Sequence, residues 1–155
     1  MSANLAVTMP SDLEIKLVRV FDAPRELVFE AHSSCEHVKN WWGRGNPLDC
    51  EMDFRPGGNW RFVEHAPDGE KYAFRGEYLE IQAPERIVWT FEFEGMPGQI
   101  CVETMELTEE GGKTTITSVT RFDTKQERDG MAASGMAEGA QQSYEALDAY
   151  LEKLK

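Results

Sequence analysis

The chain has 155 residues, of which 41% are hydrophobic and 28% charged, a balance typical of one globular domain rather than a disordered or membrane-spanning chain. Its formal net charge is −12, and an acidic surface without a basic stretch repels phosphates, so binding to nucleic acid or to an anionic membrane is disfavoured. No apolar run approaches the roughly 20 residues that a membrane helix needs. We therefore expect a short N-terminal lead-in over residues 1–12 and a single domain over residues 13–155, with no membrane insertion.

The first predicted elements are one strand and two short helices. Residues 13–21 mix apolar–polar alternation with β-branched side chains and predict a strand. Residues 24–31 begin with a proline, which suits a first helical turn, and carry apolar residues at helical spacing. Ser33 and Glu36 form the capping-box pattern of a second helix, which Gly43 ends. The apolar stripe of this second helix comprises Val38, Trp41 and Trp42.

Residues 47–122 predict six further strands, separated by short loops that are rich in Gly, Pro, Asp and Asn. Such loops connect antiparallel neighbours, because a parallel crossover needs a longer connection. With the first strand, the predicted sheet has seven strands. The six segments are NPLDCEMDF, WRFVEHA, KYAFRGEYLEI, RIVWTFEF, QICVETMEL and TTITSVTRF.

Residues 126–155 predict one long helix, because this stretch has no proline and repeats apolar residues every three to four positions. Gly130, Gly135 and Gly139 interrupt its first half, each at a cost of about 1 kcal/mol relative to alanine. Close approach of another backbone, or space left for a ligand, would explain them. The order of elements predicts an α+β fold, in which a curved seven-stranded antiparallel sheet wraps around the long C-terminal helix.

Six phrases of the sequence point to a known family: FDAPRELVFEA (21–31), WWG (41–43), DFRPGGNWRF (53–62), FRGEYLEIQAPERIVWTFEF (74–93), GGKTTIT (111–117) and SGMAEGAQQSYEALDAYL (134–151). In this order they resemble the START-like helix-grip (SRPBCC) superfamily, and more narrowly the activator-of-heat-shock-protein-ATPase homologues, or AHSA-type proteins. The resemblance implies a helix-grip fold with a cavity between the sheet and the long helix. The functions that it implies range from carrying apolar ligands, through polyketide-type cyclisation, to assisting a chaperone ATPase.

Strand alternation places an unusually aromatic set of side chains on the sheet face that looks toward the helix. Methionine adapts its shape, so the methionines of the helix opposite suit the wall of a ligand pocket. Related chains often carry a bulky residue where this one has Ala140, and alanine would enlarge or reshape the cavity. The alternative is that the same residues simply fill a core. The candidate ligand-binding residues are Trp41, Trp42, Trp60, Phe62, Glu64, Phe74, Tyr78, Trp89, Phe91, Met105, Met131, Met136 and Ala140.

Glu64 and Glu103 also fall on the apolar face by alternation. A carboxyl group in an apolar cavity would have a raised pKa, so Glu64 is the one candidate catalytic residue, as an acid or as a polar contact of the ligand. The alternative for both is a bulge or strand end that turns them to solvent, or pairing with an inward arginine such as Arg19; for Glu103 we favour this alternative. Arg55 and Arg61 are expected on the outer face or in a turn.

The segment 31–43 raises the question of a metal site or a Cys–His catalytic pair. His32, Cys35 and His37 lack a recognised zinc-ligand spacing, and helical side chains two apart point away from each other. No papain-like or caspase-like signature surrounds the cysteine. We therefore expect no metal and no cofactor. The three cysteines are odd in number and irregularly spaced, and without a secretory signal they predict reduced thiols in the cytoplasm. They are Cys35, Cys50 and Cys101.

Taken together, these features favour binding of a small apolar or aromatic ligand, such as a lipid or a polyketide-like molecule, in a cavity between the sheet and the C-terminal helix. Two alternatives stay open: an enzyme of the cyclase, hydratase or hydrolase type that uses a buried carboxylate, and an interaction module that assists a chaperone ATPase. Trp41 and Trp42 would close the mouth of the cavity, and one of them would contact the ligand. An exposed aromatic hairpin face would allow a homodimer.

Overall fold

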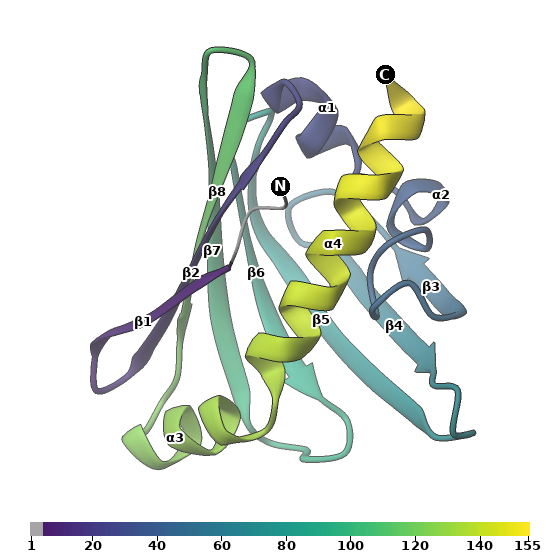
Figure 1. Ribbon diagram of the computed structural model, residues 1–155. Coiled ribbons are helices and arrows are strands. Elements are labelled where there is room, and N and C mark those ends of the chain that lie inside the picture. Colours follow the sequence, from purple (N-terminus) through teal and green to yellow (C-terminus); the bar gives the residue numbers. More distant parts are fainter. Residues whose placement is uncertain (1–4) are drawn as a thin grey trace.

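The computed structural model describes residues 5–155 and shows an antiparallel sheet that curves around a long C-terminal helix (Figure 1). The α+β helix-grip fold is confirmed. The strands are β1 (Ala6–Ser11), β2 (Glu14–Phe21), β3 (Leu48–Met52), β4 (Asn59–His65), β5 (Lys71–Gln82), β6 (Arg86–Phe93), β7 (Ile100–Glu110) and β8 (Lys113–Arg121). Their order in the sheet is β1-β2-β8-β7-β6-β5-β4-β3. The N-terminal strand β2 therefore pairs with β8, the last strand in the sequence.

The sheet has eight strands rather than the predicted seven. The additional strand is β1, which comes from the segment predicted as a lead-in and pairs antiparallel with β2. All of its residues are exposed, Val7 and Met9 included, and Pro10 argues against a strand in the sequence. Pro10 is tolerated because β1 lies at the edge of the sheet, where one side of the strand needs no partner.

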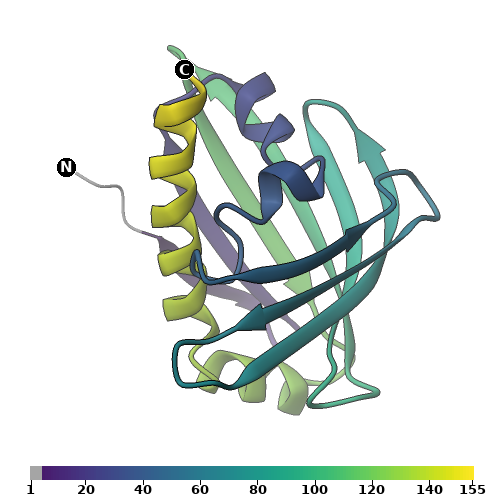
Figure 2. The same ribbon diagram turned by 90° about the vertical axis from the view of Figure 1, so that its right-hand side faces the viewer.

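Two short helices cover one end of the curved sheet, and a third covers the other (Figure 2). The helices are α1 (Arg25–Glu30), α2 (Cys35–Val38), α3 (Lys125–Ala133) and α4 (Met136–Leu154). The predicted capping box of the second helix is wrong: Ser34 is its N-cap without a side-chain hydrogen bond, and the Ser33 hydroxyl donates to the Glu30 carbonyl. The chain beyond α2 continues in turns, in which the Trp42 amide donates to the Val38 carbonyl at 3.0 Å.

The single long C-terminal helix is also corrected, because the structure divides it into α3 and α4. Gly135 is the N-cap of α4 and has a φ of 87°, in the left-handed region that glycine adopts without strain. Thr124 is the N-cap of α3, and its hydroxyl accepts a hydrogen bond from the Glu127 amide. The two helices therefore meet at an angle, with α3 across the end of the sheet and α4 along its inner face (Figure 1).

The main core lies between α4, α1 and the inner face of the sheet. Leu147 and Leu151 of α4 are buried against inward residues of β6, β7 and β8, among them Ile87, Leu107 and Ile116. Burying each such aliphatic side chain contributes roughly 1.5–3 kcal/mol. No helix within residues 5–155 combines the length and the apolar composition needed to cross a bilayer.

Candidate functional site

Aromatic rings from three neighbouring strands, together with Trp42 from the turns after α2, form a continuous layer on the inner face of the sheet. We call this layer the aromatic wall. Phe62 of β4 lies opposite Phe74 of β5, which in turn lies opposite Phe93 of β6. The ring centroid of Phe74 lies 5.4 Å from that of Phe91 and 5.2 Å from that of Phe93, within the roughly 4.5–7 Å range of interacting aromatic pairs. The wall comprises Trp42, Trp60, Phe62, Tyr72, Phe74, Phe91 and Phe93.

The two adjacent tryptophans have different surroundings. Trp41 is buried, and its indole Nε1 donates to the Ala31 carbonyl at 2.9 Å, so this side chain is part of the core. Trp42 is half-buried, and its ring centroid lies 5.0 Å from that of Phe62 and 5.1 Å from that of Phe74. Of the two, Trp42 belongs to the aromatic wall.

Trp60 sits at the centre of the wall over Gly76, its neighbour across the β4–β5 pair. A Cβ atom at Gly76 would lie 1.9 Å from the Thr90 carbonyl oxygen and 2.7 Å from Trp60 Nε1. Glycine is therefore required where the backbone of β6 and the indole approach β5 so closely. The buried Nε1 has no hydrogen-bond partner within residues 5–155, so the wall keeps one unsatisfied N–H donor.

The inner face continues beyond the wall through Tyr78, Trp89 and Met105. Trp89 is half-buried and lies opposite Tyr78 on one side and Glu103 on the other. Tyr78 is buried, which raises the pKa of its phenol and keeps it neutral. Met105 is 1% exposed. Strand alternation thus placed all three on the inner face correctly, but Tyr78 and Met105 are core residues in this structure.

The predicted site residues of α3 and α4 are half-buried. Met131, Met136 and Ala140 pack against a small apolar cluster that includes Leu17 and Cys101, and Phe91 of the aromatic wall packs against the same cluster. These helical residues therefore adjoin the edge of the wall.

The glycines of α3 and α4 are not explained by close packing. A Cβ atom at Gly130 or Gly139 would meet no atom of a neighbouring element within 4 Å in the described part of the chain. Of the two explanations that the sequence offers, close approach of another backbone is therefore wrong for these two positions.

Glu64 is buried on the inner side of β4, and one of its two carboxylate oxygens is held by neighbouring side chains. Its Oε2 accepts hydrogen bonds from Arg44 Nε at 2.9 Å and from Asn46 Nδ2 at 2.8 Å, and it forms an ion pair with Arg44. The predicted partner Arg19 is wrong for Glu64. Arg44 lies in the loop after α2 with a φ of 62°, a conformation that strand and helix patterns do not predict.

Glu103 is the second inward carboxyl, and the expectation that it faces solvent or pairs with an arginine is wrong. It accepts a hydrogen bond from the Ser118 hydroxyl at 2.5 Å, and burial raises the pKa of its carboxyl group. Arg19 instead donates to Asp148 of α4 at 2.6 Å. Arg61 is exposed on the outer face, as predicted. There it pairs with Glu94, a contact that the sequence did not predict.

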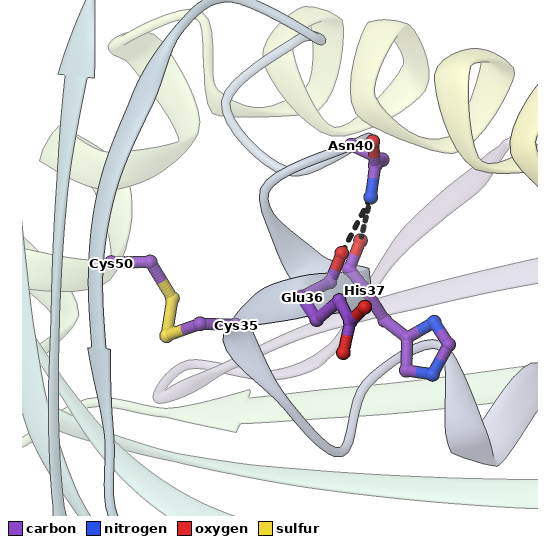
Figure 3. Close-up of a disulfide and its surroundings, with 5 residues drawn as sticks. All are labelled: Cys35, Glu36, His37, Asn40 and Cys50. Atoms are coloured by element: carbon purple, nitrogen blue, oxygen red, sulfur yellow. Dashed lines mark hydrogen bonds between the residues drawn. A yellow bond between two sulfur atoms is a disulfide. The ribbon is translucent and has the colours of Figure 1, made fainter.

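The prediction of reduced thiols is wrong for two of the three cysteines. Cys35 of α2 and Cys50 of β3 form a disulfide, which ties the short helix to the edge of the sheet (Figure 3). Cys101 is free and buried, and burial raises the pKa of its thiol to about 12. Because disulfides persist in oxidising surroundings, the cysteines no longer support a cytoplasmic location.

His32 and His37 do not converge on the cysteine. His37 points away from the disulfide (Figure 3) and hydrogen-bonds through Nδ1 with the Tyr150 hydroxyl at 2.7 Å. His32 donates from Nδ1 to the Val28 carbonyl, and burial lowers its pKa to about 4, so it is neutral at pH 7. No group of three potential metal ligands occurs in residues 5–155.

Two surface hollows lie outside the inner face of the sheet. One, of about 660 Å³, lies beside the disulfide between α2 and β3, and the other, of about 430 Å³, lies on the outer side of β4–β6. Both are lined mainly by charged and polar residues, which do not suit an apolar ligand. The enclosed cavity between the sheet and α4 stays a prediction.

Comparison with known proteins identifies the family. Residues 22–152 match the family described as Activator of Hsp90 ATPase homolog 1-like protein. The chain belongs to this family. The AHSA-type resemblance is thereby confirmed over most of the domain. No curated protein matches the chain.

Three solved structures are similar to this family member over nearly its whole length. A crystal structure from Rhodobacter sphaeroides has 25% identity and a TM-score of 0.88, and covers 98% of this chain and 100% of that chain. A solution structure from Arthrobacter aurescens has 25% identity and a TM-score of 0.85, and covers 96% of this chain and 91% of that chain. A crystal structure of Ms6760 from Mycobacterium smegmatis has 24% identity and a TM-score of 0.87, and covers 97% of this chain and 99% of that chain. At this identity the similarity shows a shared fold alone.

Proposed function

We propose that this protein binds a small apolar or aromatic ligand between the aromatic wall and the α3–α4 segment. The observation that carries the proposal is that the wall is left incompletely covered. Trp42, Phe74 and Phe91 belong to the wall yet stay half-buried, whereas inward side chains such as Ile87, Leu107 and Ile116 are buried in the core. A ligand would complete this part of the inner layer.

The free energy available from such a contact is sufficient for binding. Each 100 Å² of apolar surface that a ligand covers contributes about 2.5 kcal/mol, before the costs of association are subtracted. Flat, rigid rings lose little conformational entropy on contact, and the half-buried Met131 and Met136 can adjust to the shape of a ligand.

The enzyme alternative is less well supported at Glu64. An acid catalyst needs a carboxyl group that can exchange a proton with a substrate, but Glu64 is held by Arg44 and Asn46. The family description names a chaperone-ATPase activator homologue, and an interaction with a chaperone stays a prediction, as do a homodimer and a cytoplasmic location.

A neutral fluorescent probe, N-phenyl-1-naphthylamine, tests the proposal with Phe74→Ala. Wild-type protein is expected to enhance the probe's emission saturably, and Phe74→Ala to weaken its affinity roughly fivefold or more, because a wall ring is lost. Leu79→Ala on the same strand is the control, since Leu79 is 45% exposed on the outer side. Equal affinity in all three proteins, or no saturable binding to wild type, would refute the proposed site.

A further inference from the structure

The inner face carries an arginine whose guanidinium group is not fully used. Arg19 of β2 lies opposite Ile116 of β8, and its side chain is 0% exposed. Nη2 donates to Asp148, but the buried Nε and Nη1 have no hydrogen-bond partner in residues 5–155. An arginine stays charged at any physiological pH, and buried donors without acceptors cost free energy. The fold therefore keeps two strong donors unsatisfied.

Three more polar groups lie beside this arginine, and together the four form what we call the polar centre. Ser118 pairs with Leu17 and is thus a diagonal neighbour of Arg19 across β2–β8, a separation of roughly 7–8 Å between such residues. Ser118 donates to Glu103, whose raised pKa favours the neutral, proton-donating form. Tyr144 packs on Phe21, with ring centroids 5.3 Å apart, and the Arg19 guanidinium lies over the same Phe21 ring. Burial raises the pKa of Tyr144.

The polar centre is continuous with the aromatic wall. Trp89 lies directly opposite Glu103 in the β6–β7 pair, and Phe91 follows on the same face. On the other side, the Arg19 guanidinium lies 4.6 Å from the centroid of the Phe21 ring. Glu64, opposite Tyr72, is the buried charge nearest the wall, but it is already paired with Arg44. The inner-face cation that keeps free donors is Arg19.

We propose that the ligand of the aromatic wall is a carboxylic acid, with an apolar or aromatic body on the wall and its carboxylate oxygens accepting hydrogen bonds from the free donors of Arg19. This inference rests on the proposed function and adds the class of the ligand. Carboxylate–guanidinium hydrogen bonds are about twice as strong as neutral ones. The net charge of −12 repels anions in general, so preference for an acid has to come from this buried group.

The test compares 2-naphthylacetic acid with its uncharged methyl ester by isothermal titration calorimetry. Wild-type protein should bind the acid more tightly, on the order of 10- to 100-fold. Arg19→Met, which keeps the length of the side chain but removes its donors, should abolish this preference. Arg61→Met is the matched control, because it removes the same charge from the outer face, and it should behave as wild type.

The outcomes separate this inference from the proposed function. Equal affinity for acid and ester in wild type, or an unchanged preference in Arg19→Met, overturns the carboxylate assignment, and binding of the neutral N-phenyl-1-naphthylamine would then leave the proposed function intact. Failure of wild type to bind acid, ester or neutral probe overturns both. If Arg19→Met lacks a cooperative unfolding transition, the comparison of acid and ester in wild type decides the matter alone.

Discussion

Replacing Gly76 by alanine is expected to damage both stability and the aromatic wall. The added Cβ would lie 1.9 Å from the Thr90 carbonyl oxygen and 2.7 Å from Trp60 Nε1. The first of these atoms is backbone, so relief requires β5 and β6 to separate locally. Overpacking of this kind costs typically 1–3 kcal/mol and occasionally more. For a chain of this length, about 3 kcal/mol corresponds to a fall in Tm of roughly 6–12 °C.

Gly130→Ala is the matched control for this experiment. It adds the same methyl group inside α3, where a Cβ would meet no neighbouring element of residues 5–155 within 4 Å, so alanine should stabilise the helix by up to about 1 kcal/mol. Thermal unfolding followed by circular dichroism measures both variants. Gly76→Ala with a Tm equal to that of wild type would refute the argument that glycine is needed beneath Trp60.

Two further predictions concern the segment around α2. The Cys35–Cys50 disulfide spans a sequence separation of 15, so its reduction should lower the free energy of unfolding by about 3 kcal/mol; urea unfolding with and without dithiothreitol measures this, and no difference would contradict it. His32 has a folded pKa of about 4 against 6.5 for the free group because burial disfavours its charged form. Its contribution to stability is complete above about pH 6.5 and is lost as the pH falls toward 4. Wild type should therefore lose about 2–3 kcal/mol more than His32→Gln over this range, and parallel pH profiles would show that His32 plays no part.

The overall fold was predictable because most elements bury one face and so leave a period in the sequence. Alternation located the strands and placed the wall residues on one side, as Phe62, Phe74 and Phe91 illustrate. β1 was missed because its apolar alternation is short and exposed, with only Val7 and Met9, and because Pro10 argues against a strand. The division between α3 and α4 was missed because Gly130, Gly135 and Gly139 look alike in the sequence, whereas only Gly135 of the three has a positive φ.

The contacts between distant segments could not be predicted from local patterns. Glu64 pairs with Arg44 because a loop residue turns inward with positive φ, and alternation says nothing about loops. Cys35 meets Cys50 because α2 lies against the β3 edge, and the odd number of cysteines hid the pair. The unsatisfied donors of Arg19 emerge only when every hydrogen bond around the side chain is known.

The claim that the inner face binds an apolar ligand is tested most directly by native mass spectrometry of the freshly purified protein. We expect a defined additional mass on the wild-type chain that is released on denaturation, and its loss from a Trp42→Ala/Phe74→Ala variant that still unfolds cooperatively. A wild-type spectrum that contains the bare chain alone, before and after incubation with apolar acids, esters and aromatic hydrocarbons, would contradict the claim.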